Sequence, residues 1–466
     1  MGIEAVVEGD GGEERPEVLQ DHPKSHMLLE RNQTCMEGAE GRVGHVYADL
    51  GERFSLKGRR HTNQYAQLYF QRLMNVSPGL SELARQKWKT VKKSTILDVQ
   101  IGQDCWVLGT LYKHMKKKPC VLDEYNIDFD PDQEKPEKYT AEDDYLIMED
   151  EGARMKLIGD ALPKSLLVTG VVIAVRGKEV EGGDFQVSDV CFRTPQLHQT
   201  VPEVMEDKYV ALLSGLDVGD AKDPLKTLLL VQYLIGSLGS EYDQVLSSKI
   251  TRVVVAGNAM AYVEPPSLKL GEKQQKSRLT EPLKELEVYL SQLAATVPLD
   301  IMPGMQDPAN LSLPQQPLHA CMCGEAGKLD MLNRVHNPHN FSIDGAEFLG
   351  TSGQNIDDMY RFSSETDRLK LLEMSLTWGH MVPTAPDTLP CFPFSDKDPF
   401  IIQSCPHVYF AGNQPQYSQK LVQCSEGTST RLITVPSFAQ TGTVVLVNTR
   451  TLKCHPITFD VSAIGA

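Results

Sequence analysis

Four apolar runs that each stop at a glycine-containing loop constrain the fold of this chain more than any other feature. The runs are residues 209–213, 253–256, 297–302 and 407–411, and the loops after them begin at Ser214, Gly257, Pro303 and Gly412. Such runs are typical of buried strands that end at a turn. Helical patterns separate them, so the sequence predicts an α/β sheet. The loops of such a sheet gather along one edge, where open α/β folds usually place ligands and chemistry.

The sequences of these loops resemble the calcineurin-like metallophosphoesterases, whose motifs are Asp-x-His, Gly-Asp-x-x-Asp, Gly-Asn-His-Asp/Glu and Gly-His-x-His. A two-metal site needs carboxylate and imidazole ligands to hold both cations and to polarise water. The corresponding positions of this chain hold Gly215 and Asp217, Asn258 and Ala261, Met305 and Gln306, and Asn413 and Pro415. The resemblance therefore implies a phosphoesterase scaffold that has lost its metal site, and we expect no catalytic residues and no cofactor.

A few acids could still act as metal ligands. Asp307 stands where the family has the final acid of its third motif, Asp217 remains in the first loop, and Asp357-Asp358 is a further pair of candidate ligands. One or two carboxylates could hold a weakly bound Mg²⁺, but they could not position two metals and a hydroxide. We expect Asp357-Asp358 to cap or bound a helix. A divergent metal-dependent phosphoesterase or nuclease is the alternative.

Three further motifs indicate a more specific family. They are Leu313-Pro314-Gln315-Gln316-Pro317-Leu318-His319, Phe348-Leu349-Gly350-Thr351-Ser352-Gly353-Gln354-Asn355 and Ala385-Pro386-Asp387-Thr388-Leu389. With the degenerate loops, they resemble the small, B-type subunits of eukaryotic DNA polymerase delta from about residue 51 to the C-terminus. The small subunits of polymerases alpha and epsilon share this architecture and are the alternative.

That resemblance implies a nuclear, non-catalytic subunit of the replicative polymerase. Such a subunit would bind the C-terminal metal-cluster domain of the catalytic subunit and the N-terminal part of another accessory subunit. It would bridge the two, stabilise the holoenzyme in DNA replication and repair synthesis, and meet DNA mainly through its partners.

Composition limits the classes of function. The 466 residues carry a formal charge of −16, and residues 1–50 hold 11 acids against 4 bases. An acidic chain is unsuited to gripping nucleic acid as its main task, because non-specific affinity comes from Lys and Arg that neutralise phosphates. The richest apolar run, residues 228–238, is interrupted by polar residues and is too short for a membrane span. Without a signal-peptide pattern at the N-terminus, we expect an intracellular protein that makes no membrane contact.

The predicted organisation is an α+β multidomain protein. Residues 1–50 are acidic and predict a disordered tail, and residues 51–203 predict a helical lead-in followed by an oligonucleotide-binding (OB) fold. This barrel is predicted from about five strands with glycine-rich turns, at residues 105–111, 145–148, 155–158, 166–175 and 185–187. Residues 204–466 then form the calcineurin-like phosphoesterase α/β sandwich that lacks its metal site.

A lysine cluster in the barrel has two interpretations. Lys113, Lys116, Lys117 and Lys118 lie near the first loop between barrel strands, where OB folds often bind nucleic acid. We favour a solvated turn over a weak nucleic-acid contact, because no base-stacking aromatic residues are evident beside the cluster. An independent single-strand-binding module remains a third hypothesis for the chain.

Several short sequence patterns outside these motifs carry further predictions. Pro78-Gly79 should break the first helix in two, and residues 336–339 should form a surface loop because Pro338 bars a regular helix. Ser363 or Ser364 should cap a helix that closes near Gly379. Residues 431–435 and 443–447 are predicted to be strands of a second sheet. Cys321 and Cys323 are expected to be reduced thiols, since their spacing does not suit a zinc site.

Overall fold

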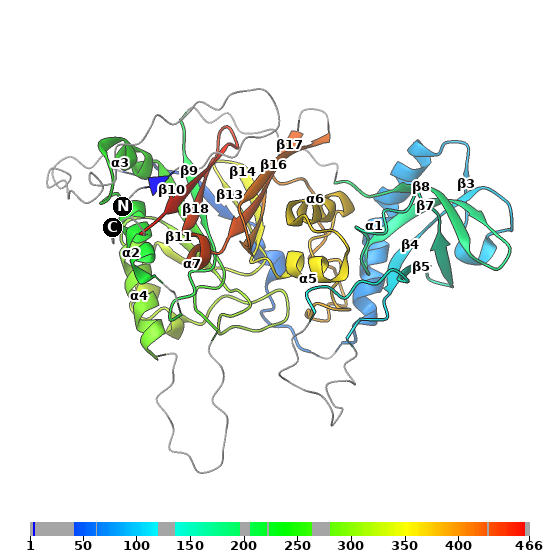
Figure 1. Ribbon diagram of the computed structural model, residues 1–466, viewed down its shortest axis with the longest axis horizontal. Coiled ribbons are helices and arrows are strands. Elements are labelled where there is room, and N and C mark those ends of the chain that lie inside the picture. The colour runs from blue at the N-terminus through cyan, green and yellow to red at the C-terminus, as the bar shows by residue number, and fades with distance from the viewer. Residues whose placement is uncertain are drawn as a thin grey trace, which may run out of the picture. The chain divides into compact units, whose positions relative to one another are not determined.

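The computed structural model describes residues 42–61, 63–119, 136–195, 206–220, 223–262, 280–425 and 428–461, and the backbone of Ile3–Glu4 (Figure 1). These residues form two compact units. The first comprises Met1–Gly58, Gln199–Gln354 and Pro406–Ala466, and the second comprises Arg59–His198 and Asn355–Cys405. Both units combine segments that are distant in sequence, and the predicted linear boundaries near residues 51 and 204 stay predictions. Among the described residues, no helix is long and apolar enough to cross a bilayer.

The first unit is built on two sheets. The order of sheet A is β1 (Ile3–Glu4), β19 (Cys454–Phe459), β18 (Thr443–Asn448), β9 (Tyr209–Leu213), β10 (Ile250–Ala256), β11 (Leu299–Met302) and β12 (Leu332–Arg334). The order of sheet B is β16 (Ser418–Ser425), β17 (Thr428–Pro436), β15 (Val408–Gln414), β14 (Ala346–Thr351), β13 (His339–Ile343) and β2 (Tyr47–Asp49). Neighbouring strands from β9 to β12 are parallel, as are β14 and β15.

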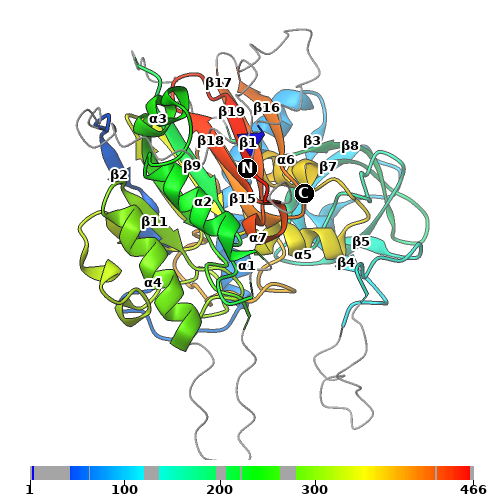
Figure 2. The same cartoon turned by 60° about the vertical axis from the view of Figure 1, so that its left-hand side comes forward.

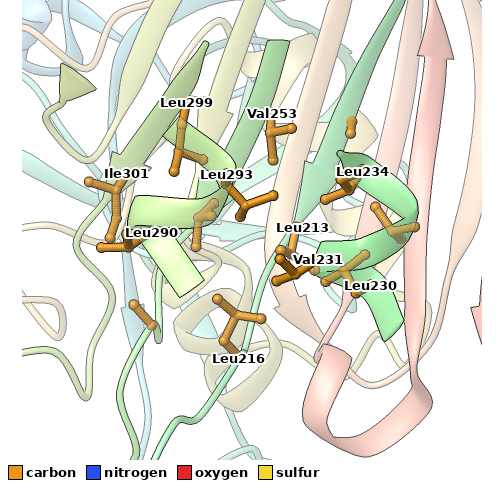
Figure 3. Packing of buried hydrophobic residues seen from close by; sticks show 14 of the residues in the cluster. Leu213, Leu216, Leu230, Val231, Leu234, Val253, Leu290, Leu293, Leu299 and Ile301 are labelled. Atoms are coloured by element: carbon orange, nitrogen blue, oxygen red, sulfur yellow. The ribbon is translucent and has the colours of Figure 1, made fainter. Parts of the chain in front are cut away.

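Two hydrophobic clusters hold this unit together. One lies between the sheets and takes residues from both, such as Val254 of β10 and Phe410 of β15. The other lies on the opposite face of sheet A, where helices α2 (Pro224–Leu234), α3 (Glu241–Ser248) and α4 (Thr280–Ala294) cover it (Figure 2). Figure 3 shows Leu230 of α2 and Leu290 of α4 among the side chains packed in this second cluster. Every residue of β10 is buried, as expected for a parallel strand that is covered on both faces.

The predicted second sheet is half right. β17 and β18 are joined by the short helix α7 (Phe438–Thr441), but β17 pairs with β15 in sheet B and β18 pairs with β9 in sheet A. The chain therefore crosses from one sheet to the other at α7. Both strands read as buried β-structure in the sequence, and nothing local distinguishes the partner that each one takes.

The second unit contains a closed barrel of five strands. They are β4 (Cys105–His114), β5 (Tyr145–Glu149), β6 (Arg154–Ile158), β7 (Val172–Glu179) and β8 (Phe185–Cys191). The pairing order is β4-β5-β6-β8-β7, and β7 pairs with β4 to close the ring. This strand order and the five-stranded closure agree with the predicted OB fold.

Short elements and helices surround this barrel. They are α1 (Ala66–Lys87), β3 (Lys92–Lys93), η4 (Ile96–Asp98), α5 (Gln354–Phe362), most of which belongs to this unit, and α6 (Arg368–Trp378). Asp367 rather than Ser363 or Ser364 caps α6, by accepting a hydrogen bond from the Leu369 N–H. As predicted, α6 ends at Gly379, which has a left-handed conformation. Three further short helices, η3 (Gly51–Phe54), η6 (Ala320–Met322) and η7 (Ala326–Lys328), belong to the first unit.

The predicted break at Pro78-Gly79 is wrong, because α1 runs without interruption through both residues. Pro78 and Gly79 are exposed, whereas Val76, Leu80 and Ala84 are buried against the barrel. Burial of this face offsets the hydrogen bond that proline cannot donate, and water can solvate the carbonyl left open on the exposed side. Packing against the barrel therefore outweighs the tendency of Pro78-Gly79 to end a helix.

A buried ion pair ties α1 to the rest of the second unit. Arg72 is 1% exposed, and its Nε donates to Asp398 at 2.8 Å. Its remaining nitrogens donate to the carbonyls of Gly170, Pro383 and Ala385. His380 Nε2 also lies 2.8 Å from Asp398. Burial opposes ionisation of Asp398, but these two partners outweigh it and hold the pKa of Asp398 well below its usual range.

Removing this guanidinium should destabilise the second unit strongly. We expect Arg72→Ala to lower the free energy of unfolding by about 3–5 kcal/mol, because a buried carboxylate and three carbonyls lose their partner. The matched control is Arg59→Ala, which breaks a pair with Asp396 at the surface and should cost at most about 1 kcal/mol. Urea unfolding followed by tryptophan fluorescence reports on this unit, since all three tryptophans lie in it. Equal losses in the two variants would contradict the prediction.

Candidate functional site

The loops singled out in the sequence meet at one edge of the first unit. Parallel pairing places the carboxyl ends of β9, β10 and β11 side by side. The loops after them are joined directly: the Gly215 N–H donates to the Gly257 carbonyl at 2.9 Å, and the Asp217 N–H donates to the Asn258 carbonyl at 3.1 Å. The degenerate motif positions in these loops are therefore close together, as the sequence predicted for the edge of an α/β sheet.

Three of these positions have a left-handed backbone. The φ angles of Asp217, Asn258 and Asn413 are 45°, 49° and 54°. Asparagine and aspartate adopt this conformation more easily than other residues that carry a side chain. The loops also approach closely, because a Cβ on Gly304 would lie 2.2 Å from the Asn258 nitrogen. Tight backbone geometry is thus present at positions where the resemblance expects metal ligands.

Asp307 acts as an acceptor for the backbone of two loops. Its carboxylate accepts hydrogen bonds from the N–H groups of Gly304 at 2.7 Å, Met260 at 2.9 Å and Ala259 at 3.2 Å. The residue is 4% exposed. Burial raises the pKa of Asp307, and these backbone donors oppose that shift. A carboxylate engaged in this way serves the loop structure, and few of its lone pairs remain for a cation.

Asn413 joins the two sheets at the same edge. Its N–H donates to Ser214 Oγ at 2.9 Å, and its Nδ2 donates to the carbonyls of Ala256 at 3.2 Å and Ser352 at 2.8 Å. Of the other degenerate motif positions, Met305, Gln306 and Pro415 are exposed and Ala261 is buried. An imidazole at position 413 would offer a metal ligand, whereas the amide present there cross-links β10 to the loop after β14.

The side chains present do not fit a two-metal centre. Within the described parts of the chain, no group of three or more His, Cys, Asp or Glu side chains could hold a metal ion. The buried carboxylate of Asp307 and the exposed one of Asp220 both lie close enough to Asp217 for their charges to raise its pKa. Asp217 Oδ1 and Asn413 Oδ1 are buried atoms without a hydrogen-bond partner. Two carboxylates, one of them bound to backbone, cannot assemble a bridged pair of cations and a hydroxide.

Asp357 and Asp358 lie within α5, in the second unit, and do not cap or bound it as predicted. Asp357 forms an ion pair with Arg368. Asp358 is 7% exposed and accepts a hydrogen bond from Thr388 Oγ1 at 2.6 Å. Burial raises the pKa of Asp358 to about 6. The two carboxylates therefore have separate structural partners.

A buried amide network was missed in the sequence. Asn337 is 0% exposed, and its Nδ2 lies within 2.8 Å of Gln315 Oε1, Ser352 Oγ and Gln354 Oε1. Gln315 Nε2 in turn donates to the Gly304 carbonyl at 2.9 Å. The predicted surface loop at residues 336–339 is thus wrong, because Asn337, Pro338 and His339 are buried and His339 begins β13. The signal that could have found it is the pair of glutamine-containing motifs, whose polar residues need buried partners.

The lysine cluster of the barrel is only partly available for a ligand. Lys113 is 4% exposed and donates to the Phe362 carbonyl at 3.0 Å, and burial lowers its pKa to about 8. Lys116 pairs with Asp143, and Lys118 pairs with Asp387. Lys117 is exposed. Two of the four charges are balanced and one is buried, so the cluster provides little positive potential for a phosphate backbone.

Both units contain residues that match known protein families. Residues 64–190 match the family described as the DNA polymerase delta subunit OB-fold domain, and residues 210–419 match the family of B-type subunits of DNA polymerases alpha and epsilon. A DNA polymerase delta small subunit of Oryza sativa subsp. japonica is 44% identical over 89% of this chain and 98% of its own length. The chain belongs to the DNA polymerase delta small subunit family.

Other members of that family match over a similar span. The Arabidopsis thaliana small subunit is 45% identical over 89% of this chain and 95% of its own length. The small subunit of Saccharomyces cerevisiae is 31% identical over 87% of this chain and 91% of its own length. The predicted resemblance to polymerase delta small subunits and the predicted OB fold are therefore confirmed.

The Asp217 carboxylate should cost stability at neutral pH. Burial, followed by the charge of Asp307, raises its pKa from 3.8 to about 6. The folded state therefore binds this proton more tightly than the unfolded state, so the contribution of Asp217 to stability is greatest below about pH 4 and falls as the pH rises to about 6. Asp217→Asn should raise the free energy of unfolding at pH 7.5 by about 1 kcal/mol, a value reduced for partial exposure to solvent.

Thermal unfolding followed by circular dichroism across this pH range tests the prediction. The gain in the free energy of unfolding should vanish near pH 4. The substitution should not strain the backbone, because Asn is compatible with the left-handed conformation at this position. Asp220→Asn, at an exposed residue of the same loop, is the matched control and should show a smaller gain, because the Asp220 charge is only a minor contributor to the raised pKa of Asp217. A loss of stability in Asp217→Asn at pH 7.5 would mean that a cation or another partner holds the carboxylate.

Proposed function

We propose that this chain is a non-catalytic accessory subunit of nuclear DNA polymerase delta. In this proposal it bridges the catalytic subunit, through that subunit's C-terminal metal-cluster domain, and the N-terminal part of another accessory subunit. Its contribution to replication and repair synthesis is assembly and stability of the holoenzyme. Membership of the small subunit family supports the polymerase assignment.

The observation that carries the non-catalytic part is the chemistry of the loop edge. Neutral residues, including Asn258 and Asn413, stand at the degenerate motif positions other than Asp217. The Asn413 side chain and the Asp307 carboxylate are engaged with the backbone of neighbouring loops. We propose that the two sheets and their outer helices are a calcineurin-like phosphoesterase sandwich whose former metal edge has become a hydrogen-bonded structural closure.

The bridging role is tested by affinity capture. The full chain should retain the isolated C-terminal domain of a polymerase delta catalytic subunit in a stable complex, and should not retain the equivalent domains of polymerases alpha and epsilon. Size-exclusion chromatography of the mixtures then measures whether each pair elutes together. Selective binding to the alpha or epsilon domain would reassign the chain to that polymerase, and binding to none of them would refute the bridge.

The alternative function, a divergent metal-dependent phosphoesterase or nuclease, rests on Asp217 and Asp307. It requires Mn²⁺-dependent hydrolysis that persists through purification and is lost in Asp217→Asn. We expect the purified chain to release no more product from a phosphodiester substrate with Mn²⁺ than with EDTA, since too few ligands are present to activate water. The Asp217→Asn protein is the matched control, and activity present only in the unsubstituted chain would overturn the non-catalytic assignment.

A further inference from the structure

A second basic segment spans the end of α1 and the residues after it, and it has no role in the proposed function. Residues 85–93 contain Arg85, Lys87, Lys89, Lys92 and Lys93, and no Asp or Glu occurs from residue 83 to residue 97. In a chain with a formal charge of −16, five cations within nine residues are a marked local exception. Such a concentration of charge raises the local density of negatively charged partners.

The fold explains only part of this segment. Arg85 and Lys87 lie in the last turn of α1, where cations favour the helix dipole. Lys87 also pairs with Asp189 at 2.8 Å, and Arg85 approaches Glu82 at 3.9 Å. Beyond the helix, these two reasons no longer apply.

The remaining three lysines surround an exposed strand end. Lys89, Lys92 and Lys93 are exposed, and no ion pair joins any of them to an acid in the described part of the chain. Lys93 Nζ lies 3.4 Å from Ser81 Oγ and 5.5 Å from the centre of the Trp106 ring. These contacts leave the positive charge of Lys93 without a neutralising carboxylate.

A hollow of about 650 Å³ opens beside these lysines. Its lining includes Lys92, Lys93, Gln100 and Gln103. One acid, Asp98, also lines the hollow and accepts a hydrogen bond from Thr95 Oγ1 at 2.7 Å. β3, which forms one side, pairs with β4 and with no second strand among those described.

Apolar side chains stand open at the same place. Leu97, which lines the hollow, is 72% exposed, and Ile101, which lies in the chain between the lining residues Gln100 and Gln103, is 67% exposed. These are among the most exposed large apolar side chains in the described residues. An apolar partner group that covered them would gain the free energy of removing that surface from water.

These features together select one class of ligand. Unneutralised lysines favour carboxylates or phosphates, but exposed Leu97 and Ile101 gain nothing from a phosphate backbone. Single-stranded nucleic acid would need accessible aromatic rings for its bases. The tryptophans of this region, Trp88 and Trp106, are only 4% and 1% exposed. A peptide that carries both acidic and apolar side chains satisfies the charges and the apolar surface at once.

We infer that the hollow beside β3 is a docking site for an extended segment of a partner protein in which carboxylates alternate with apolar side chains. The carboxylates meet Lys92 and Lys93, and the apolar side chains cover Leu97 and Ile101. The free side of β3 offers the peptide backbone a strand edge to lie against. This inference does not depend on the bridge proposed above, because it concerns a surface in the second unit and a different partner chemistry.

Fluorescence anisotropy with the full chain tests the site. The probe is a fluorescein-labelled peptide of about eight residues that alternates glutamate with leucine, a length sufficient for one added strand. Lys92→Glu/Lys93→Glu should weaken its binding at least about tenfold, because attraction becomes repulsion. Leu97→Ser/Ile101→Ser should weaken it about fivefold through loss of apolar contact.

The controls separate this site from general electrostatics. Lys117→Glu/Lys164→Glu makes the same change of charge at two exposed lysines of the same unit and should change the affinity less than about twofold. A peptide with equal charge but with glycine in place of leucine should bind more weakly and should not respond to Leu97→Ser/Ile101→Ser. Unchanged far-ultraviolet circular dichroism verifies that each variant is folded, since Lys93 lies against Trp106 and its replacement can alter tryptophan fluorescence directly.

Three results would overturn the inference. One is equal binding of the glutamate-leucine and glutamate-glycine peptides. Another is equal weakening by the Lys92/Lys93 and Lys117/Lys164 charge reversals. The third is tighter binding of an oligothymidylate of matched charge that is lost in Lys92→Glu/Lys93→Glu, which would assign the surface to nucleic acid instead.

Discussion

Three backbone N–H groups that converge on the Asp307 carboxylate hold the functional edge of this molecule in shape. They come from the loops after β10 and β11, and the hydrogen bonds from Met260 and Gly304 are short enough to be strong. A buried carboxylate is costly unless such donors compensate it. With them in place, the close approach of Gly304 to Asn258 becomes possible, and the Asn258 and Asn413 amides can link the neighbouring loops.

This arrangement explains why the edge keeps its shape without cations. In a two-metal site, the metals neutralise apposed carboxylates and draw the loops together. Here the cross-links are neutral: the Asn413 amide bridges two carbonyls, and the buried Asn337 amide joins Gln315, Ser352 and Gln354. The family motifs that contain Gln315 and Gln354 therefore lie beneath the loops, where they supply the hydrogen bonds that the loops need. These hydrogen bonds give the two glutamine-containing motifs a structural role in supporting the loops.

Local signals in the sequence predicted the parts of the fold that depend on local chemistry. Strands ending at Leu213, Ala256 and Met302 were recognisable because an apolar run stops at a glycine or proline. The placement of β17 and β18 in different sheets could not be recognised in this way. Each strand is apolar enough to pair with either β15 or β9, and only the packing of the whole chain decides between them. The same limit applies to the lysine cluster. Lys118 pairs with Asp387, which is 269 residues away in sequence, and the charges of the residues around Lys118 do not predict such a distant partner.

Asp217 is the acid among the positions where the resemblance expects metal ligands. Its left-handed backbone and its N–H bond to the Asn258 carbonyl serve the loop, but its Oδ1 is buried without a partner. The neighbouring Asp307 charge adds to the cost of ionising it. An asparagine would satisfy the same backbone without that charge. The stability of the edge must therefore come from Asp307, the amide network and the cores beneath the sheets, with the Asp217 carboxylate opposing them at neutral pH.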